Sequence, residues 1–71
     1  MQFMQIKELR EERGWPPEAL AAAMGVAPSI LEQWEREVIL PASRDLPRLA
    51  ALLGCEIGAL YTEEAKAATV A

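Results

Sequence analysis

Apolar side chains recur along this chain every three or four residues, which is the spacing of one face of an α-helix. The first such run predicts a helix over about residues 4–13, and Gly14 marks its C-terminal end. A second helix is predicted over residues 17–24. Pro17 suits its first turn, where a missing N–H costs little, and Gly25 ends it.

The same spacing predicts a third helix that opens at Pro28. In this helix Leu31 and Trp34 lie one turn apart on a single face, which favours a place in the core for the tryptophan. The stretch from 36 to 44 has no such period and contains Pro41, so we expect a loop there.

Two further helices complete the pattern. Asp45 is predicted to cap a fourth helix, about residues 46–53, which ends at Gly54. A short fifth helix is predicted over about residues 57–61. The tail 63–71 offers no apolar face to bury, and we expect it to be flexible.

Residues 17–36 fit two short helices joined by a tight turn, the helix-turn-helix hairpin that many proteins use to read DNA. Ala21 is small where the second helix must cross closely, and Gly25 can take the positive φ that starts the turn. The positions that face the core of such a hairpin are all apolar here: Leu20, Met24, Val26, Leu31 and Trp34.

Length and composition fit one small all-α domain, which we expect to span residues 1–62. The 71 residues are 52% hydrophobic, mostly Ala and Leu, and these are good helix formers. Charge complicates the DNA-binding interpretation. The net charge is −4, whereas DNA-binding domains are normally basic, and residues 26–35 contain no Lys or Arg.

The inventory of reactive side chains argues against catalysis. The chain has no His and one cysteine, Cys55, so the usual nucleophile–base pairs and Cys metal clusters cannot be assembled. We therefore expect no enzyme activity, no metal, no cofactor and no small-molecule ligand, with Cys55 a half-buried filler. No apolar run reaches the roughly 20 residues of a membrane span, and the first residues are too charged for a secretory signal. A cytoplasmic protein is expected.

Three segments carry a resemblance to a known family: IKELREERG, EALAAAMGVAPSILEQWE and LPRLAALLGCEIGAL. Together, over about residues 4–61, they resemble the lambda-repressor-like (Cro/C1-type, XRE) helix-turn-helix family. The resemblance implies a compact five-helix DNA-binding domain and a transcriptional regulator of phage, plasmid or bacterial type. It also implies a homodimer on operator-like double-stranded DNA, with a recognition helix at about residues 28–35 in the major groove.

The resemblance places candidate DNA contacts on and after the third helix. Gln33 matches a base-reading position, although an exposed glutamine can equally be solvated. Three neighbours on the same helix are further candidates for base contact: Pro28, Ser29 and Glu32. Phosphate contacts are expected from the arginines that flank the following loop: Arg36, Arg44 and Arg48.

Two other sites follow from the resemblance. Arg10 and Glu35 match an ion pair between the first and third helices of the family's phage repressors, and Arg10 can alternatively contact DNA. A dimer interface is implied near the end of the domain, where apolar side chains gather: Ile57, Leu60 and Tyr61.

The sequence departs from the family in ways that bear on DNA binding. Pro17 stands where members normally contact a phosphate through the backbone, and proline has no N–H for that contact. The recognition helix begins with Ala-Pro-Ser in place of the usual polar and basic residues. An alternative function is therefore a protein-interaction module with weak or no DNA binding, which uses the surface of Pro28, Ile30 and Glu32.

Overall fold

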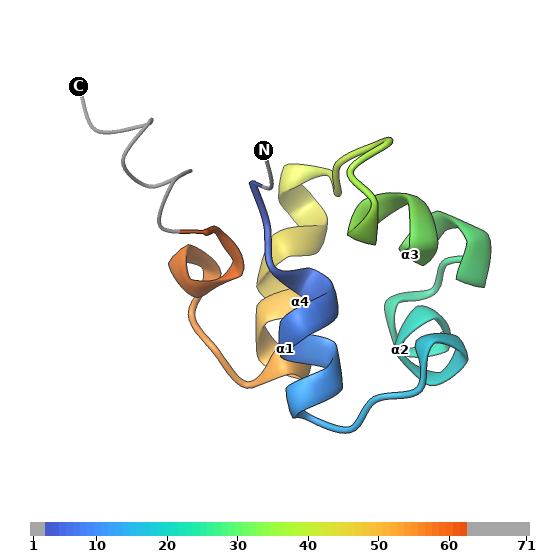
Figure 1. The fold of residues 1–71 in the computed structure, drawn as a ribbon, viewed down its shortest axis with the longest axis horizontal. Coiled ribbons are helices and arrows are strands. Elements are labelled where there is room, and N and C mark those ends of the chain that lie inside the picture. The colour runs from blue at the N-terminus through green and yellow to red at the C-terminus, as the bar shows by residue number, and fades with distance from the viewer. Residues whose placement is uncertain (1–2, 63–71) are drawn as a thin grey trace.

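Four α-helices and two short 3₁₀-helices make up the fold in the computed structural model, which describes residues 3–62. In chain order they are α1 (Ile6–Glu12), α2 (Pro17–Met24), α3 (Pro28–Glu35), η1 (Ser43–Asp45), α4 (Leu46–Leu53) and η2 (Ile57–Leu60). Figure 1 shows α1 in front of α4, with α2 and α3 on one side of them and the C-terminal turn on the other. The predicted all-helical fold is confirmed.

The core is formed by apolar side chains from all four α-helices and from the C-terminal turn. The largest fully buried ones are Ile6, Leu20, Leu31, Leu49, Leu53 and Leu60. Each such side chain contributes about 1.5–3 kcal/mol to the free energy of folding when it leaves water. The positions predicted to face the core of the hairpin lie in this cluster, and Val26 packs against it from a half-buried position.

Prolines and glycines set the ends of the central helices as the sequence predicts. Pro17 and Pro28 are the first residues of α2 and α3. Gly25 follows α2 with φ of 74°, and Gly54 follows α4 with φ of 70°. Both glycines adopt the left-handed conformation that commonly ends a helix, because glycine has no Cβ to disfavour it.

Both ends of the domain differ from the prediction. The first helix begins at Ile6 rather than at position 4, because Met4 pairs with Tyr61 in an antiparallel bridge. The short fifth helix predicted over about residues 57–61 is present only as a single 3₁₀ turn, Ile57–Leu60, so residues 3–62 contain four α-helices rather than five helices. The hydrogen bonds of this turn span three residues, as in the 3.3 Å bond that the Tyr61 N–H donates to the Gly58 carbonyl.

The loop before α4 also contains more structure than expected. Ser43–Asp45 forms the 3₁₀ turn η1, which includes the last residues of the predicted loop. Asp45 does occupy the N-cap position of α4, but the expected side-chain cap is absent. Its backbone already has helical dihedral angles, whereas a capping side chain normally acts from an extended residue. The predicted flexible tail, 63–71, lies outside the described residues.

Candidate nucleic-acid interface

The α2–α3 hairpin has the geometry of a DNA-reading helix-turn-helix. A three-residue turn, 25–27, joins the two helices, and the Val26 N–H donates a 3.0 Å hydrogen bond back to the Ala21 carbonyl. Ala21 is fully buried, as the close crossing of the helices requires. Open space surrounds the position where a Cβ on Gly25 would lie, so its left-handed backbone alone accounts for a glycine there.

Arg10 braces this hairpin from α1. Its Nε lies 2.6 Å from Glu35 Oε2, so the ion pair implied by the family resemblance is present. Its Nη2 donates to Glu35 Oε1 at 3.4 Å, and its Nη1 donates to the Trp15 carbonyl at 2.9 Å. The hydrogen bond to Glu35 raises the pKa of Arg10, against the lowering effect of burial. The pair fixes the end of α3 relative to α1.

The exposed face of α3 carries the residues predicted to contact bases. Pro28, Ser29 and Glu32 are exposed, whereas Gln33 is half-buried. Trp34 is 4% exposed and belongs to the core, as its spacing from Leu31 predicts. The first three residues are therefore open to a ligand, and Gln33 is less accessible than they are.

The three candidate arginines come from three neighbouring segments and are all exposed. Arg36 follows α3, Arg44 lies in η1 and Arg48 lies in α4. Arg36 Nη1 is 3.4 Å from Glu32 Oε1, so two predicted contact residues pair with each other. The side chains are 71% and 65% exposed, and an ion pair this open to water is weak enough to give way to a phosphate.

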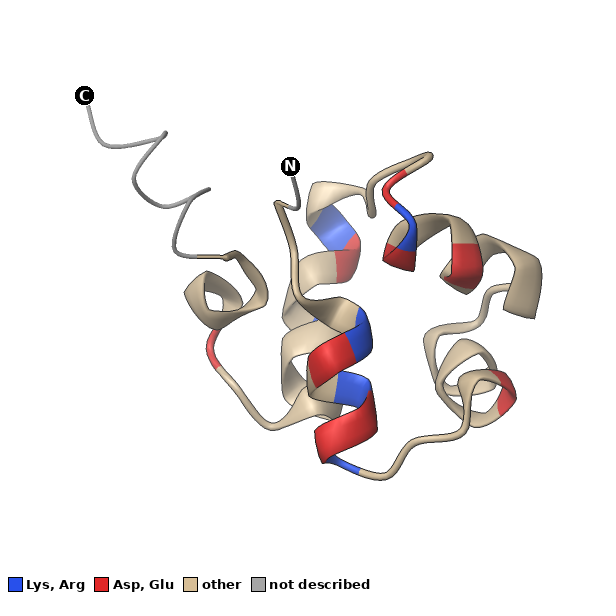
Figure 2. Cartoon of the chain, viewed as in Figure 1, with Lys and Arg blue, Asp and Glu red and all other residues tan. Residues whose placement is uncertain are grey.

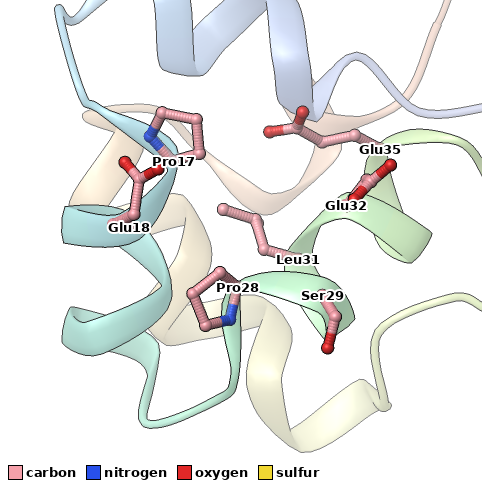
Figure 3. Close-up of a pocket in the computed structure, with 7 residues that line it drawn as sticks. All are labelled: Pro17, Glu18, Pro28, Ser29, Leu31, Glu32 and Glu35. Carbon is pink, nitrogen blue, oxygen red and sulfur yellow. The ribbon is translucent and has the colours of Figure 1, made fainter.

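A groove of about 380 Å³ lies between the N-terminal end of α2 and the length of α3 (Figure 3). Its lining residues are Pro17, Glu18, Pro28, Ser29, Leu31, Glu32 and Glu35. Carboxylates come to it from both helices, and Figure 2 shows acidic residues but no basic residue on α3 itself. Because the two prolines have no N–H, neither helix can donate a hydrogen bond to a phosphate from its first residue.

The predicted dimer interface is only partly available on the surface. Leu60 is completely buried in the core, so its assignment to an interface is wrong. The turn that holds it packs against α4, and its carbonyl accepts a 2.8 Å hydrogen bond from the Gln5 N–H. Ile57 is 41% exposed and Tyr61 is half-buried, and their role in a dimer stays a prediction.

Sequence reasoning missed Glu37, the second residue after the end of α3. Its φ of 58° makes it the one non-glycine residue with positive φ among residues 3–62. Glu37 Oε1 accepts hydrogen bonds of 2.7 Å from the backbone N–H groups of both Phe3 and Met4. The available indication was its position just after a helix end, where glycine is usual, but nothing in the sequence indicated its partners.

Comparison with known proteins supports the assignment of the chain as a helix-turn-helix domain. A family profile described as Helix-turn-helix matches residues 6–60. No curated protein matches the chain. None of the helices in residues 3–62 has the length and apolar character of a membrane span.

Several solved structures share this fold. The clp gene regulator ClgR from Corynebacterium glutamicum superposes with a TM-score of 0.73 at 25% identity, over 78% of this chain and 58% of that protein. The N-terminal DNA binding domain of SinR from Bacillus subtilis gives 0.68 at 34% identity, over 78% and 81%. Hydroxypropylphosphonic acid epoxidase from S. wedmorenis gives 0.72 at 34% identity, over 80% of this chain but only 30% of the enzyme.

Proposed function

The chain belongs to the helix-turn-helix family, and from this premise we propose that it is a sequence-specific DNA-binding transcriptional regulator of the Cro/C1 type. The observation that carries the proposal is the α2–α3 hairpin, with its glycine turn and its brace between Arg10 and Glu35, which presents one face of α3 to the outside. The likeness to SinR supports it further, because that match covers most of a DNA binding domain.

In this proposal α3 lies in the major groove of an operator-like site. Gln33 reads a base, for which adenine is the usual partner of an amide, and such a contact contributes about 1–3 kcal/mol of discrimination. Arg36, Arg44 and Arg48 contact phosphates. Three such contacts give a slope of only about −3 in a plot of log affinity against log salt. The affinity of one protomer is therefore low, and we propose that a cytoplasmic homodimer is the binding species.

No enzyme activity is part of the proposal. The likeness to the epoxidase covers 30% of that enzyme, so it concerns one part of a much longer chain. The chain likewise spans 58% of the ClgR structure. What these proteins share with it is the helical domain, and regulation of transcription is the activity that this domain supports best.

A titration of the protein into labelled duplex DNA at several salt concentrations tests the proposal. We expect Arg36→Ala together with Arg44→Ala to weaken binding to all sequences and to flatten the salt slope by about 0.9 for each lost contact. The matched control is Lys7→Ala together with Arg13→Ala. It removes the same charge from exposed positions on and just after α1. We expect its salt slope to stay closer to the wild-type slope than that of the Arg36→Ala, Arg44→Ala variant.

An equal slope in both double variants would remove Arg36 and Arg44 from the contact surface. The absence of any DNA binding by the folded wild-type protein at low salt would overturn the proposal as a whole. Circular dichroism of each variant shows that the helices are intact before the affinities are compared.

The acidic groove favours a second candidate, a protein-interaction module built on the same frame. The carboxylates of Glu18 at the start of α2 and Glu32 in the middle of α3 repel phosphate and suit a basic segment of a protein partner. Replacement of Glu18 and Glu32 by Gln separates the two functions. A DNA-binding domain gains affinity for DNA when the two carboxylates are removed. A protein-interaction module shows no DNA binding before the change and no longer binds its basic partner after it.

A further inference from the structure

Glu37 holds a backbone conformation that glutamate rarely adopts. Its φ of 58° lies in the left-handed region, where the Cβ of an L-residue is crowded by its own backbone. Such conformations persist where the surrounding structure holds them in place. At this position the surroundings are the chain's own N-terminal residues.

The carboxylate of Glu37 binds two successive backbone N–H groups. Oε1 accepts one hydrogen bond from Phe3 and one from Met4, each 2.7 Å long. Hydrogen bonds to an ionised carboxylate are about twice as strong as those between neutral groups. The bond from Met4 is partly shielded from water, and the Met4 side chain is buried in the core.

Residues 3–5, here named the N-terminal strap, are bound on their other side to the C-terminal segment. The Thr62 N–H donates to the Phe3 carbonyl at 2.8 Å, and the Gln5 N–H donates to the Leu60 carbonyl at 2.8 Å. Gln5 adds a side-chain bond of 2.8 Å from Nε2 to the Ala59 carbonyl. In Figure 1 the dark blue strap runs beside the orange-red C-terminal turn. The strap is therefore a fixed support.

The segment after Glu37 folds back onto the recognition helix. The Val38 N–H donates a 2.9 Å hydrogen bond to the Gln33 carbonyl, and the Ile39 N–H lies 3.5 Å from the same oxygen. Glu37 therefore lies between the strap and the turn after α3, and this turn is bonded to the carbonyl of Gln33, the predicted base-reading residue.

We propose that Glu37 is a positioning residue for DNA recognition: its carboxylate latches the end of α3 to the N-terminal strap and so fixes the orientation of Gln33 and Arg36. The inference rests on the proposed function for its DNA-binding part. The latch itself does not depend on that function, because it consists of the two hydrogen bonds to Glu37 and the left-handed turn.

The test compares Glu37→Gln with Glu12→Gln. Both changes remove one carboxylate charge, and Glu12 is an exposed residue at the end of α1. Loss of a negative charge alone strengthens attraction to DNA. We expect Glu12→Gln to show this small gain, whereas Glu37→Gln binds duplex DNA more weakly than the wild type, by about fivefold or more, the lower end of typical coupling between sites.

Amide hydrogen exchange of the free protein reads the latch directly. We expect the Phe3 and Met4 amides to exchange faster in Glu37→Gln than in the wild type and in Glu12→Gln. Glu37→Gly is the second variant, because glycine accepts the left-handed φ without strain and preserves the turn. It should remain folded and show the same loss of amide protection.

Each readout can overturn its part of the inference. Unchanged exchange of the Phe3 and Met4 amides in both Glu37 variants would show that the latch does not exist in solution. In another outcome, the Phe3 and Met4 amides exchange faster in the Glu37 variants, but these variants bind DNA as tightly as the Glu12→Gln control. This result would show that the latch holds the strap but does not position the recognition helix. Wild-type protein that binds no DNA would overturn the positioning role together with the proposed function, and amide exchange would still report on the latch.

Discussion

Arg10 illustrates how one side chain can be charged, buried and still compatible with a stable core. A guanidinium removed from water is costly unless its donors are paired. Arg10 is 8% exposed, and its Nε, Nη1 and Nη2 all have partners, two on the Glu35 carboxylate and one on the Trp15 carbonyl. The arrangement orients α3 against α1 and the loop that leads into α2, so its main contribution is to the geometry of the hairpin.

Removal of one member of this pair should be more harmful than removal of both. Arg10→Met leaves the Glu35 carboxylate, 11% exposed, without its cation. We expect a loss of about 3 kcal/mol in the free energy of unfolding, a large part of the total for a domain of this size. Arg10→Met combined with Glu35→Leu should lose clearly less. Urea unfolding followed by circular dichroism measures both, and a double variant as unstable as the single one would contradict this account.

Cys55 gives a prediction for the pH dependence of stability. Burial raises the pKa of its thiol above the ordinary value of 9.0, and the charge of Arg13 opposes this only in part. A raised pKa in the folded state means that the unfolded chain loses the proton first. The stabilising contribution is therefore complete below pH 9.0 and is lost as the pH rises through the folded-state pKa.

Cys55→Ala should consequently flatten the alkaline loss of stability. The wild type is expected to lose more unfolding free energy than the variant between about pH 8 and about pH 10, where a thiol of ordinary pKa titrates. Urea midpoints at the two pH values give the difference, and the other groups that titrate in this range cancel in the comparison. Parallel losses in the two proteins would show that the thiol is freely solvated.

At the scale of the elements, the turn between α2 and α3 depends on the backbone of Gly25. A Cβ there would meet open space, so the only cost of a side chain is the left-handed φ of 74°. Gly58 offers a matched control, because its surroundings are equally open and its backbone is not in the left-handed region.

Gly25→Ala should lower the free energy of unfolding by about 1 kcal/mol, and Gly58→Ala should change it by much less. For a domain of 60–100 residues this corresponds to a fall of about 4–8 °C in Tm. Thermal unfolding of the wild type and the two variants measures these differences in Tm. If both variants melt at the same temperature, the left-handed turn is not what glycine provides at position 25.

The elements also show what the sequence could and could not predict. Pro17, Pro28, Gly25 and Gly54 act on their own neighbours, and the helix ends that they indicate were correct. Their effect is local, because it depends on the dihedral angles of one residue.

The errors concern residues whose partners are distant in the chain. Leu60 lies on an apolar face, and periodicity identifies such a face without showing what covers it. Residues 3–5, which form hydrogen bonds with the segment around Leu60, lie more than fifty positions away. The conformation of Glu37 depends on the same residues, which are 33 and 34 positions away. Among the candidate contacts, the Arg36–Glu32 pair could have been predicted from its four-residue spacing.

Across the whole molecule, the helix-turn-helix fold indicates DNA binding, whereas the net charge indicates that this binding is weak. The hairpin, its brace and its glycine turn have the geometry of a DNA-reading domain. The chain nevertheless carries a net charge of −4, and carboxylates from both hairpin helices line the groove between the start of α2 and α3. The hairpin geometry and the negative charge are compatible with each other if each protomer binds DNA weakly and two protomers bind together. Linked sites gain affinity without new contacts.

A selection of the purified protein against random duplex DNA at low salt is the direct test of operator binding by two protomers. We expect enrichment of a two-fold-symmetric site whose half-sites lie about one helical turn apart, roughly 34 Å. Gln33→Ala should relax the preference at one position of each half-site and leave the fold intact. A folded wild-type protein that enriches no sequence would contradict the account and would favour a protein partner at the acidic groove between α2 and α3.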